Sequence, residues 1–173
     1  MIFRKTFVLP QKVLFEEVDA GAAVHHPNYL KYMERGRCQA MEESGLSFGK
    51  FMAQGFALVV SEINSKYLRS LRIEESFYVV SRVVAVRKSS TKVLQAIVTK
   101  CPSEDVLIAA GDNILHLPHL AFAAQVRLVC VNLETARPHE FPEFLKAKMH
   151  LPSENDFENH PVWRDVRITL PAE

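Results

Sequence analysis

The feature that most constrains the fold is one well-delimited helical segment surrounded by strand-like sequence. Between residues 28 and 44, apolar and small residues such as Tyr29 and Met33 recur at helical spacing, which predicts a helix with one buried face. Pro27 suits its first turn, where a missing N–H costs nothing, and Gly45 suits the position just beyond its end. A helix with such a face needs other elements to bury it.

The segments around this helix predict the rest of the fold. Before it, residues 6–17 have the pattern of an extended strand, in which Pro10 indicates an edge position or a bulge because proline cannot donate to the ladder. After it come four runs that are rich in Val and Ile and partly alternate, at residues 56–67, 76–87, 91–100 and 122–132. This order predicts an α+β fold in which an antiparallel sheet wraps around one long helix.

The sequence pattern leaves questions open in three regions. Residues 77–80 are apolar on both faces of their predicted strand, so we expect a second layer, contributed by another subunit, on the outer face of the sheet. Residues 102–120, which contain Pro102, Gly111 and Pro118, allow either a strand continuation or a lid. The tail, residues 146–173, alternates near its end and is expected to dock as an extra edge strand, outside a main domain of residues 1–145.

Composition excludes several classes of function. The 173 residues are 48% hydrophobic, which suits one ordinary domain. Twenty-one Lys and Arg face twenty Asp and Glu, and without a long basic run nucleic acid is not an expected partner. The apolar runs are too short for a membrane-spanning helix, and the N-terminus lacks the pattern of a secretion signal. Three scattered cysteines offer neither a disulfide framework nor a metal knuckle, so we predict a cytoplasmic protein.

The residues with the most chemical information are 17–30, Glu-Val-Asp-Ala-Gly-Ala-Ala-Val-His-His-Pro-Asn-Tyr-Leu, between the first strand and the helix. Taken alone, Asp19 before a Gly-containing loop is more often a turn former than a catalyst, because Asp readily satisfies local backbone donors. Adjacent His25 and His26 diverge, and the pair His116 and His119 has no complementary ligand pair elsewhere, so no metal site is expected.

This stretch resembles the signature of the 4-hydroxybenzoyl-CoA thioesterase family, in which an acid ends the first strand, a small-residue loop follows and a His or aromatic residue precedes the helix. The likeness covers residues 6–145 and is close to the bacterial acyl-CoA thioesterases associated with the Tol–Pal gene cluster. It continues through residues 28–37, 66–67, 72–75, 129–132 and 137–138. Ala22 departs from the family pattern, because glycine is frequent there.

The resemblance implies a hotdog fold and hydrolysis of an acyl-CoA to the free acid and CoA. Asp19 would be the nucleophile or the general base, and the backbone N–H of His26 would polarise the thioester carbonyl. Free N–H groups at a helix start carry partial positive charge and suit that role. The His26 side chain would orient the water or the thioester and pass a proton to the leaving thiolate. Because a CoA thiol is a good leaving group, neither a metal nor a cofactor is expected.

The resemblance also implies substrate contacts and an assembly. The expected substrate-binding residues are Val24, His25, Tyr29, Lys66, Arg69 and Arg72, the last three as candidates for CoA phosphates. Each of these has an ordinary alternative, since a helical tyrosine is commonly core and a cation commonly lies in a solvated turn. A homodimer, pairing into a homotetramer, is the expected assembly.

Two other functions remain open at this point. The same fold could bind an acyl-CoA, or an acyl group on an acyl-carrier protein, without turnover. It could also hydrate or dehydrate an acyl thioester, which would need a differently placed histidine and acid.

Overall fold

The structure of the protein, a computed structural model, describes residues 6–146. The expected edge strand near residues 162–168 therefore lies outside the described residues, while the predicted domain boundary at 145/146 falls inside the last helix. The elements are β1 (Phe7–Lys12), the 3-10 turn η1 (Phe15–Glu17), α1 (Pro27–Glu43), α2 (Phe48–Ala53), β2 (Phe56–Tyr67), β3 (Ser76–Val86), β4 (Ser90–Val98), α3 (Glu104–Ala110), the 3-10 turn η2 (Ile114–His116), β5 (Leu120–Asn132), β6 (Arg137–Pro138) and α4 (Glu143–Lys146).

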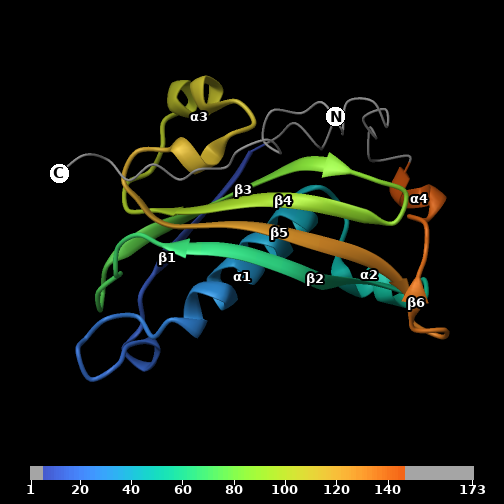
Figure 1. The fold of residues 1–173 in the computed structure, drawn as a ribbon, viewed down its shortest axis with the longest axis horizontal. Coiled ribbons are helices and arrows are strands. Elements are labelled where there is room, and N and C mark those ends of the chain that lie inside the picture. Colours follow the sequence, from blue (N-terminus) through green and yellow to red (C-terminus); the bar gives the residue numbers. More distant parts are fainter. Residues whose placement is uncertain (1–5, 147–173) are drawn as a thin grey trace.

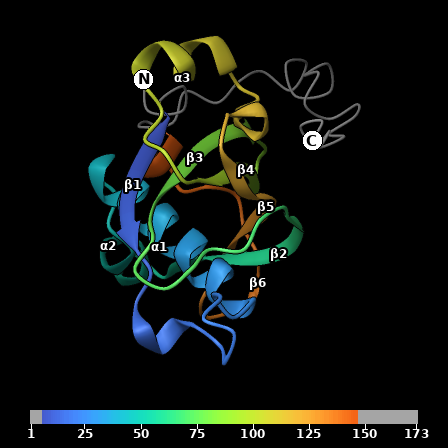
Figure 2. The ribbon, with the colours of Figure 1, turned by 90° about the vertical axis from the view of Figure 1, so that its left-hand side faces the viewer.

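The strands form one curved antiparallel sheet with α1 held against its inner face (Figures 1 and 2). The strand order is β1-β3-β4-β5-β2, with short β6 beside β5, so β1 and β2 are the two edges of the main sheet. Pro10 lies in edge strand β1, as the sequence predicts. The predicted helix is confirmed to within one residue at each end, and the four later strands to within two. Gly45 has a φ of 74° just after α1, a backbone conformation that glycine adopts without strain.

The first strand is shorter than predicted. It ends at Lys12, and the chain turns through η1 before Asp19, whereas the sequence pattern extends the strand to residue 17. The alternation continues past Lys12 because Val13 is still buried in the core, with 1% of its surface exposed. The chain then turns to bring the buried Glu17 to α1, which period-two alternation does not reveal.

Close contact between α1 and the sheet forms the main core. Tyr29, Tyr32 and Met33 of α1 pack with Phe77 and other apolar side chains of the inner sheet face. Gly36 permits the closest approach, since a Cβ there would lie 2.6 Å from Val79 Cγ1. Helix and sheet are thus in van der Waals contact along the middle of α1.

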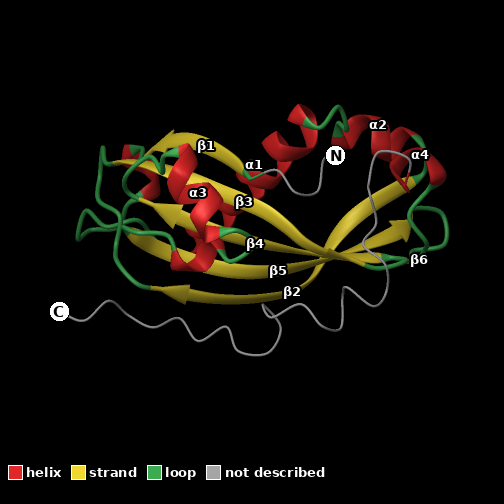
Figure 3. Cartoon of the chain, turned by 90° about the horizontal axis from the view of Figure 1, so that it is seen from above, coloured by secondary structure: helices red, strands yellow, loops and turns green. Residues whose placement is uncertain are grey.

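Part of the outer face of the sheet is covered by the chain itself, not by a second subunit as expected from the sequence. Residues from α3 and η2 lie on that face (Figure 3), where Ile114, Leu115 and Leu117 cluster with Val80 and Leu94. The strand continuation considered for residues 102–120 is therefore wrong. The Ser103 side chain accepts a hydrogen bond from Val106 N and so caps α3, which ends before Gly111.

Candidate active site

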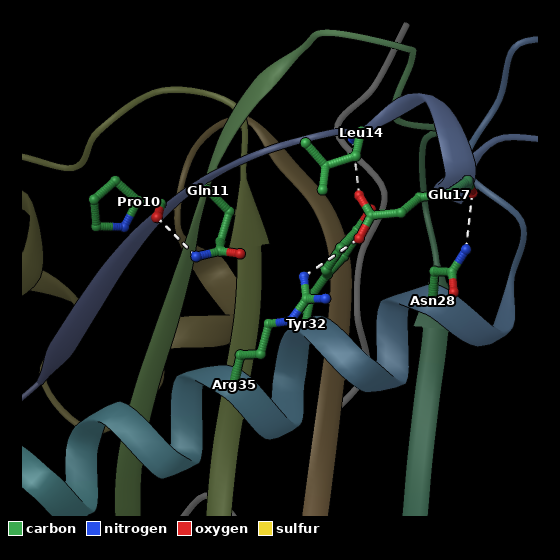
Figure 4. Close-up of polar contacts among 7 residues, drawn as sticks. All are labelled: Pro10, Gln11, Leu14, Glu17, Asn28, Tyr32 and Arg35. Carbon is green, nitrogen blue, oxygen red and sulfur yellow. Dashed lines mark hydrogen bonds and ion pairs between the residues drawn. The ribbon is translucent and has the colours of Figure 1, made fainter.

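Glu17 anchors the loop before α1 to the helix (Figure 4). Its side chain accepts hydrogen bonds from Tyr32 Oη at 2.7 Å and Leu14 N at 2.9 Å, and it pairs with Arg35 at 3.3 Å. Its main-chain oxygen accepts hydrogen bonds from Asn28 Nδ2 and from His25 N. Burial and the bond to Glu17 raise the pKa of Tyr32, so its hydroxyl remains a donor. These contacts fix where the chain enters α1.

Asp19 lies two residues further on, exposed, in a tight turn. Its Oδ1 accepts hydrogen bonds from Gly21 N at 2.8 Å and Ala23 N at 3.3 Å, and its main chain is paired with Ala22 and Ala23. The turn-forming role is thus present in the structure. Both side-chain bonds within residues 6–146 fall on Oδ1, which leaves Oδ2 able to accept a proton from water or to attack a carbonyl carbon.

The backbone conformation at Ala22 explains why glycine is frequent at this position of the family pattern. It has a φ of 56°, a left-handed conformation that glycine adopts without strain and alanine at a cost of about 1–2 kcal/mol. Arg72 Nη1 donates to the neighbouring Gly21 carbonyl at 3.0 Å, and Val24 N donates to Leu71 O. The loop is therefore held by the segment that follows β2 as well as by its own turn.

The helix start faces the same side of the fold as this loop. The N–H of His25 is used by Glu17, whereas no hydrogen bond engages the N–H of His26 among the described residues. The two imidazole rings are exposed and in edge contact, with centroids 4.7 Å apart, so the expectation that they diverge is wrong. No hydrogen bond joins Asp19 to either ring in the described part of the chain. A free N–H at the first turn of α1 can bind a carbonyl oxygen.

The other expected substrate-binding residues differ in their surroundings. Val24 and Tyr29 are buried, with 6% and 2% of their surfaces exposed, and Tyr29 Oη accepts a hydrogen bond from Leu71 N. Burial raises the pKa of Tyr29. These two side chains are therefore part of the core next to the candidate site.

The three expected cations are all exposed but are not equally available. Arg69 makes a two-pronged ion pair with Glu75, and Arg72 holds the Gly21 carbonyl through one guanidinium nitrogen. Lys66 forms no side-chain hydrogen bond or ion pair within residues 6–146. A bound phosphate would compete with a structural contact at Arg69 and Arg72.

Tyr67 was not expected among the site residues. Its hydroxyl donates to the His26 carbonyl at 3.2 Å, and its ring contacts Tyr29 and Phe122 with centroids 5.2 and 4.8 Å apart. About half of the residue is exposed, 49%. The available signal was an aromatic residue at the last position of a predicted strand, beside Lys66, but only the fold brings that strand end to the start of α1.

Residues 6–146 contain neither a metal-binding cluster nor a membrane-spanning helix. No group of three His, Cys, Asp or Glu side chains there is arranged to hold a metal ion. No helix in that range combines the length and apolar character that crossing a bilayer requires.

Comparison with known proteins identifies relatives along most of the chain. It is 25% identical over 142 residues to the acyl-CoA thioester hydrolase YbgC of Escherichia coli, covering 82% of this chain and 94% of that protein. It is 26% identical over 145 residues to the acyl-CoA thioesterase YbgC of Haemophilus influenzae, covering 83% and 94%.

Solved structures share the fold at low sequence identity. A 1,4-dihydroxy-2-naphthoyl-CoA thioesterase from Synechocystis superposes with a TM-score of 0.68 at 14% identity, covering 83% of this chain and 95% of that one. A Staphylococcus aureus protein solved in complex with CoA gives 0.68 at 18% identity, covering 84% and 82%. The expected hotdog fold is confirmed. Since the family model described as the thioesterase-like superfamily matches residues 13–149, this chain belongs to that superfamily.

Proposed function

We propose that this protein hydrolyses an acyl-CoA thioester to a free carboxylic acid and CoA. One observation carries the proposal: an exposed Asp19 carboxylate lies in a fixed loop beside a helix start, and among residues 6–146 neither its Oδ2 nor the His26 N–H has a hydrogen-bond partner. The relatives named as acyl-CoA thioester hydrolases support it.

In the proposed mechanism, the thioester carbonyl oxygen binds the N–H of His26, which stabilises the negative charge that develops there. Asp19 either removes a proton from an attacking water or attacks the carbonyl carbon itself. In both routes a C–O bond forms, the C–S bond breaks and CoA leaves as thiolate. After direct attack the acyl group stays on Asp19 as an anhydride, which a water then hydrolyses to the free acid. The His26 ring, exposed at the same place, would return a proton to that thiolate.

We further propose roles for the surrounding residues. Val24 and Tyr29 form the core side of the substrate site, and His25 lies on its solvent side. The cations Lys66, Arg69 and Arg72 attract the CoA phosphates. Lys66 is the strongest candidate among the three, because its ammonium group is not used elsewhere in the described structure. We propose a cytoplasmic location, as the cysteine usage indicates.

A homodimer is the assembly that we propose. Edge strand β2 is twelve residues long and exposes Val59, Val60 and Ile63. A long edge with exposed apolar side chains is a template for pairing with another strand, and a second copy would remove it from solvent. The tetramer stays a prediction, and the self-covered outer face removes one reason for it.

Thiol release from a panel of short, long, branched and aromatic acyl-CoAs tests the proposal, with wild type beside Asp19→Asn and Asp19→Ala. Asparagine can keep both turn hydrogen bonds through its Oδ1, so this variant isolates the carboxylate charge. We expect turnover to fall at least about a hundredfold in both. Glu16→Gln, which removes an exposed acid nearby, should retain activity.

The same experiment distinguishes the alternatives. Tight acyl-CoA binding without thiol release in the wild type would replace hydrolysis by a binding function. In a single turnover in ¹⁸O-labelled water, an unlabelled acid product demonstrates direct attack by Asp19 followed by attack of water on the Asp19 carboxyl carbon, because general-base catalysis always labels the product.

A further inference from the structure

A cavity of about 80 Å³ lies against the C-terminal half of α1, away from Asp19. At a rise of about 1.5 Å per residue, the cavity-lining Ala40 lies about 20 Å along the helix axis from His26. The middle of α1, where Gly36 contacts the sheet, lies between the two places. The cavity is therefore separate from the candidate active site.

Apolar side chains from several elements line most of this cavity. They include Met41 of α1, Leu58 of β2, Val93 of β4, Leu128 of β5 and Phe141. Three of the lining residues, Met41, Leu46 and Phe48, are only partly buried, so a ligand can reach the cavity from solvent beside them. Such a lining favours an aliphatic group.

Two guanidinium groups also line the cavity, and they differ in their partners. Arg82 is paired with Asp112 and donates to Thr6 Oγ1. Arg37 donates to the neutral Gln95 Oε1 at 2.8 Å, and no carboxylate among residues 6–146 forms an ion pair with it. Glu34, one turn earlier, is exposed to solvent.

The surroundings of Arg37 are unfavourable for an uncompensated charge. Burial lowers the pKa of Arg37, against the opposing effect of Glu34. The Gln95 amide is committed on its other side, since Nε2 donates to Met33 O and Ser81 Oγ. An anion that reached Arg37 from the cavity would therefore meet a cation with donors to spare.

We propose that this cavity binds a free aliphatic carboxylic acid, with its alkyl chain among the apolar side chains and its carboxylate on Arg37. A guanidinium matches the two oxygens of a carboxylate in geometry and charge. At roughly 10–15 Å³ of such volume per water-sized group, the cavity takes a chain of about six carbons. The site does not depend on thioester hydrolysis, because it binds an acid supplied as such.

Titration calorimetry on the full chain tests the site with hexanoate and hexan-1-ol. We expect Arg37→Met to weaken hexanoate binding at least about tenfold, as the loss of a charge-assisted contact does, and to leave hexan-1-ol binding unchanged. The control Lys31→Met removes an exposed cation from the same helix and should change neither. Equal hexanoate affinity in wild type and Arg37→Met, or no binding to wild type at millimolar concentration, overturns the proposal.

Two further measurements locate the ligand. Ala40→Phe fills the cavity from α1 and should abolish binding of both compounds, which keeps the proposal testable if Arg37→Met fails to fold. Saturating CoA should leave hexanoate binding unchanged. Displacement of hexanoate by CoA, or undiminished binding to a folded Ala40→Phe variant, would assign the acid to another place and overturn the proposal.

Discussion

At the residue scale, two carboxylates separated by one residue have opposite surroundings. Glu17 is 5% exposed and bound by a tyrosine hydroxyl, a backbone N–H and an arginine, so it holds the loop in place. Asp19 is exposed and has one carboxylate oxygen outside the turn. The division suits a site in which one acid fixes geometry and the other reacts.

Glu75 gives a prediction about pH at this scale. Burial alone would raise its pKa, but hydrogen bonds from Arg69 and the Arg72 N–H outweigh burial and lower it. A lowered pKa means that the folded state favours the ionised form of Glu75. The stability that ionised Glu75 contributes is therefore present above its pKa in the unfolded chain, about 4.3, and is lost as pH falls through its pKa in the folded protein.

We therefore expect Glu75→Gln to reduce the free energy of unfolding by about 1–2 kcal/mol at pH 7, with the difference from wild type shrinking below about pH 4. Urea unfolding at pH 7, 5 and 3.5 measures it. The adjacent exposed Glu74→Gln is the control and should show a small difference at every pH. A loss for Glu75→Gln that is constant with pH would contradict the assignment.

At the scale of elements, the distance between α1 and the sheet is set by Gly36. The missing side chain allows Val79 and Ser81 to lie against the helix backbone, and the buried Gln95 bonds to Met33 O one turn earlier. Helix and sheet thus meet through contacts that no other residue type at position 36 permits without a shift.

Gly36→Ala should destabilise the protein by about 1–3 kcal/mol, because the new Cβ would lie 2.6 Å from Val79 Cγ1 and the two layers must separate. Gly49→Ala in α2 is the matched control. Nothing lies within 4 Å of a Cβ there, so the higher helix propensity of alanine should stabilise the protein by up to about 1 kcal/mol. Thermal or denaturant unfolding checks both, and equal effects of the two substitutions would refute the close-contact explanation.

At the scale of the whole molecule, the two edges and the two faces of the sheet have different environments. The inner face packs on α1, and α3 with η2 packs on part of the outer face. Edge strand β2 retains a row of exposed apolar side chains. We therefore expect the proposed pairing with a second copy to occur at that edge.

Ile63→Lys should shift the proposed dimer toward monomer, because it adds a charge on edge strand β2. The control Ile108→Lys makes the same change at an exposed position of α3, where 69% of the residue surface is accessible, and should leave the mass unchanged. Light scattering after gel filtration measures the masses. A monomeric wild type, or an Ile63→Lys variant that remains fully dimeric, would rule out pairing through β2.

The sequence by itself determined the elements that depend on local periodicity and on proline and glycine. Residues 28–44 predicted α1 because its apolar spacing and its two boundary residues act within a few turns, and the later strands followed from alternation. The family signature likewise marked Asp19 and His26 as candidates. Local signals of this kind need no knowledge of what lies across the fold.

The tertiary structure alone decided which groups meet across long sequence distances. It buried Glu17 against Tyr32, brought Tyr67 to His26, and laid α3 and η2 over a face that alternation assigned to another subunit. It also left Arg37 beside an apolar cavity with a neutral partner. Burial and pairing of a polar side chain depend on its neighbours in space, and those neighbours are set by sheet order and by the distance between helix and sheet.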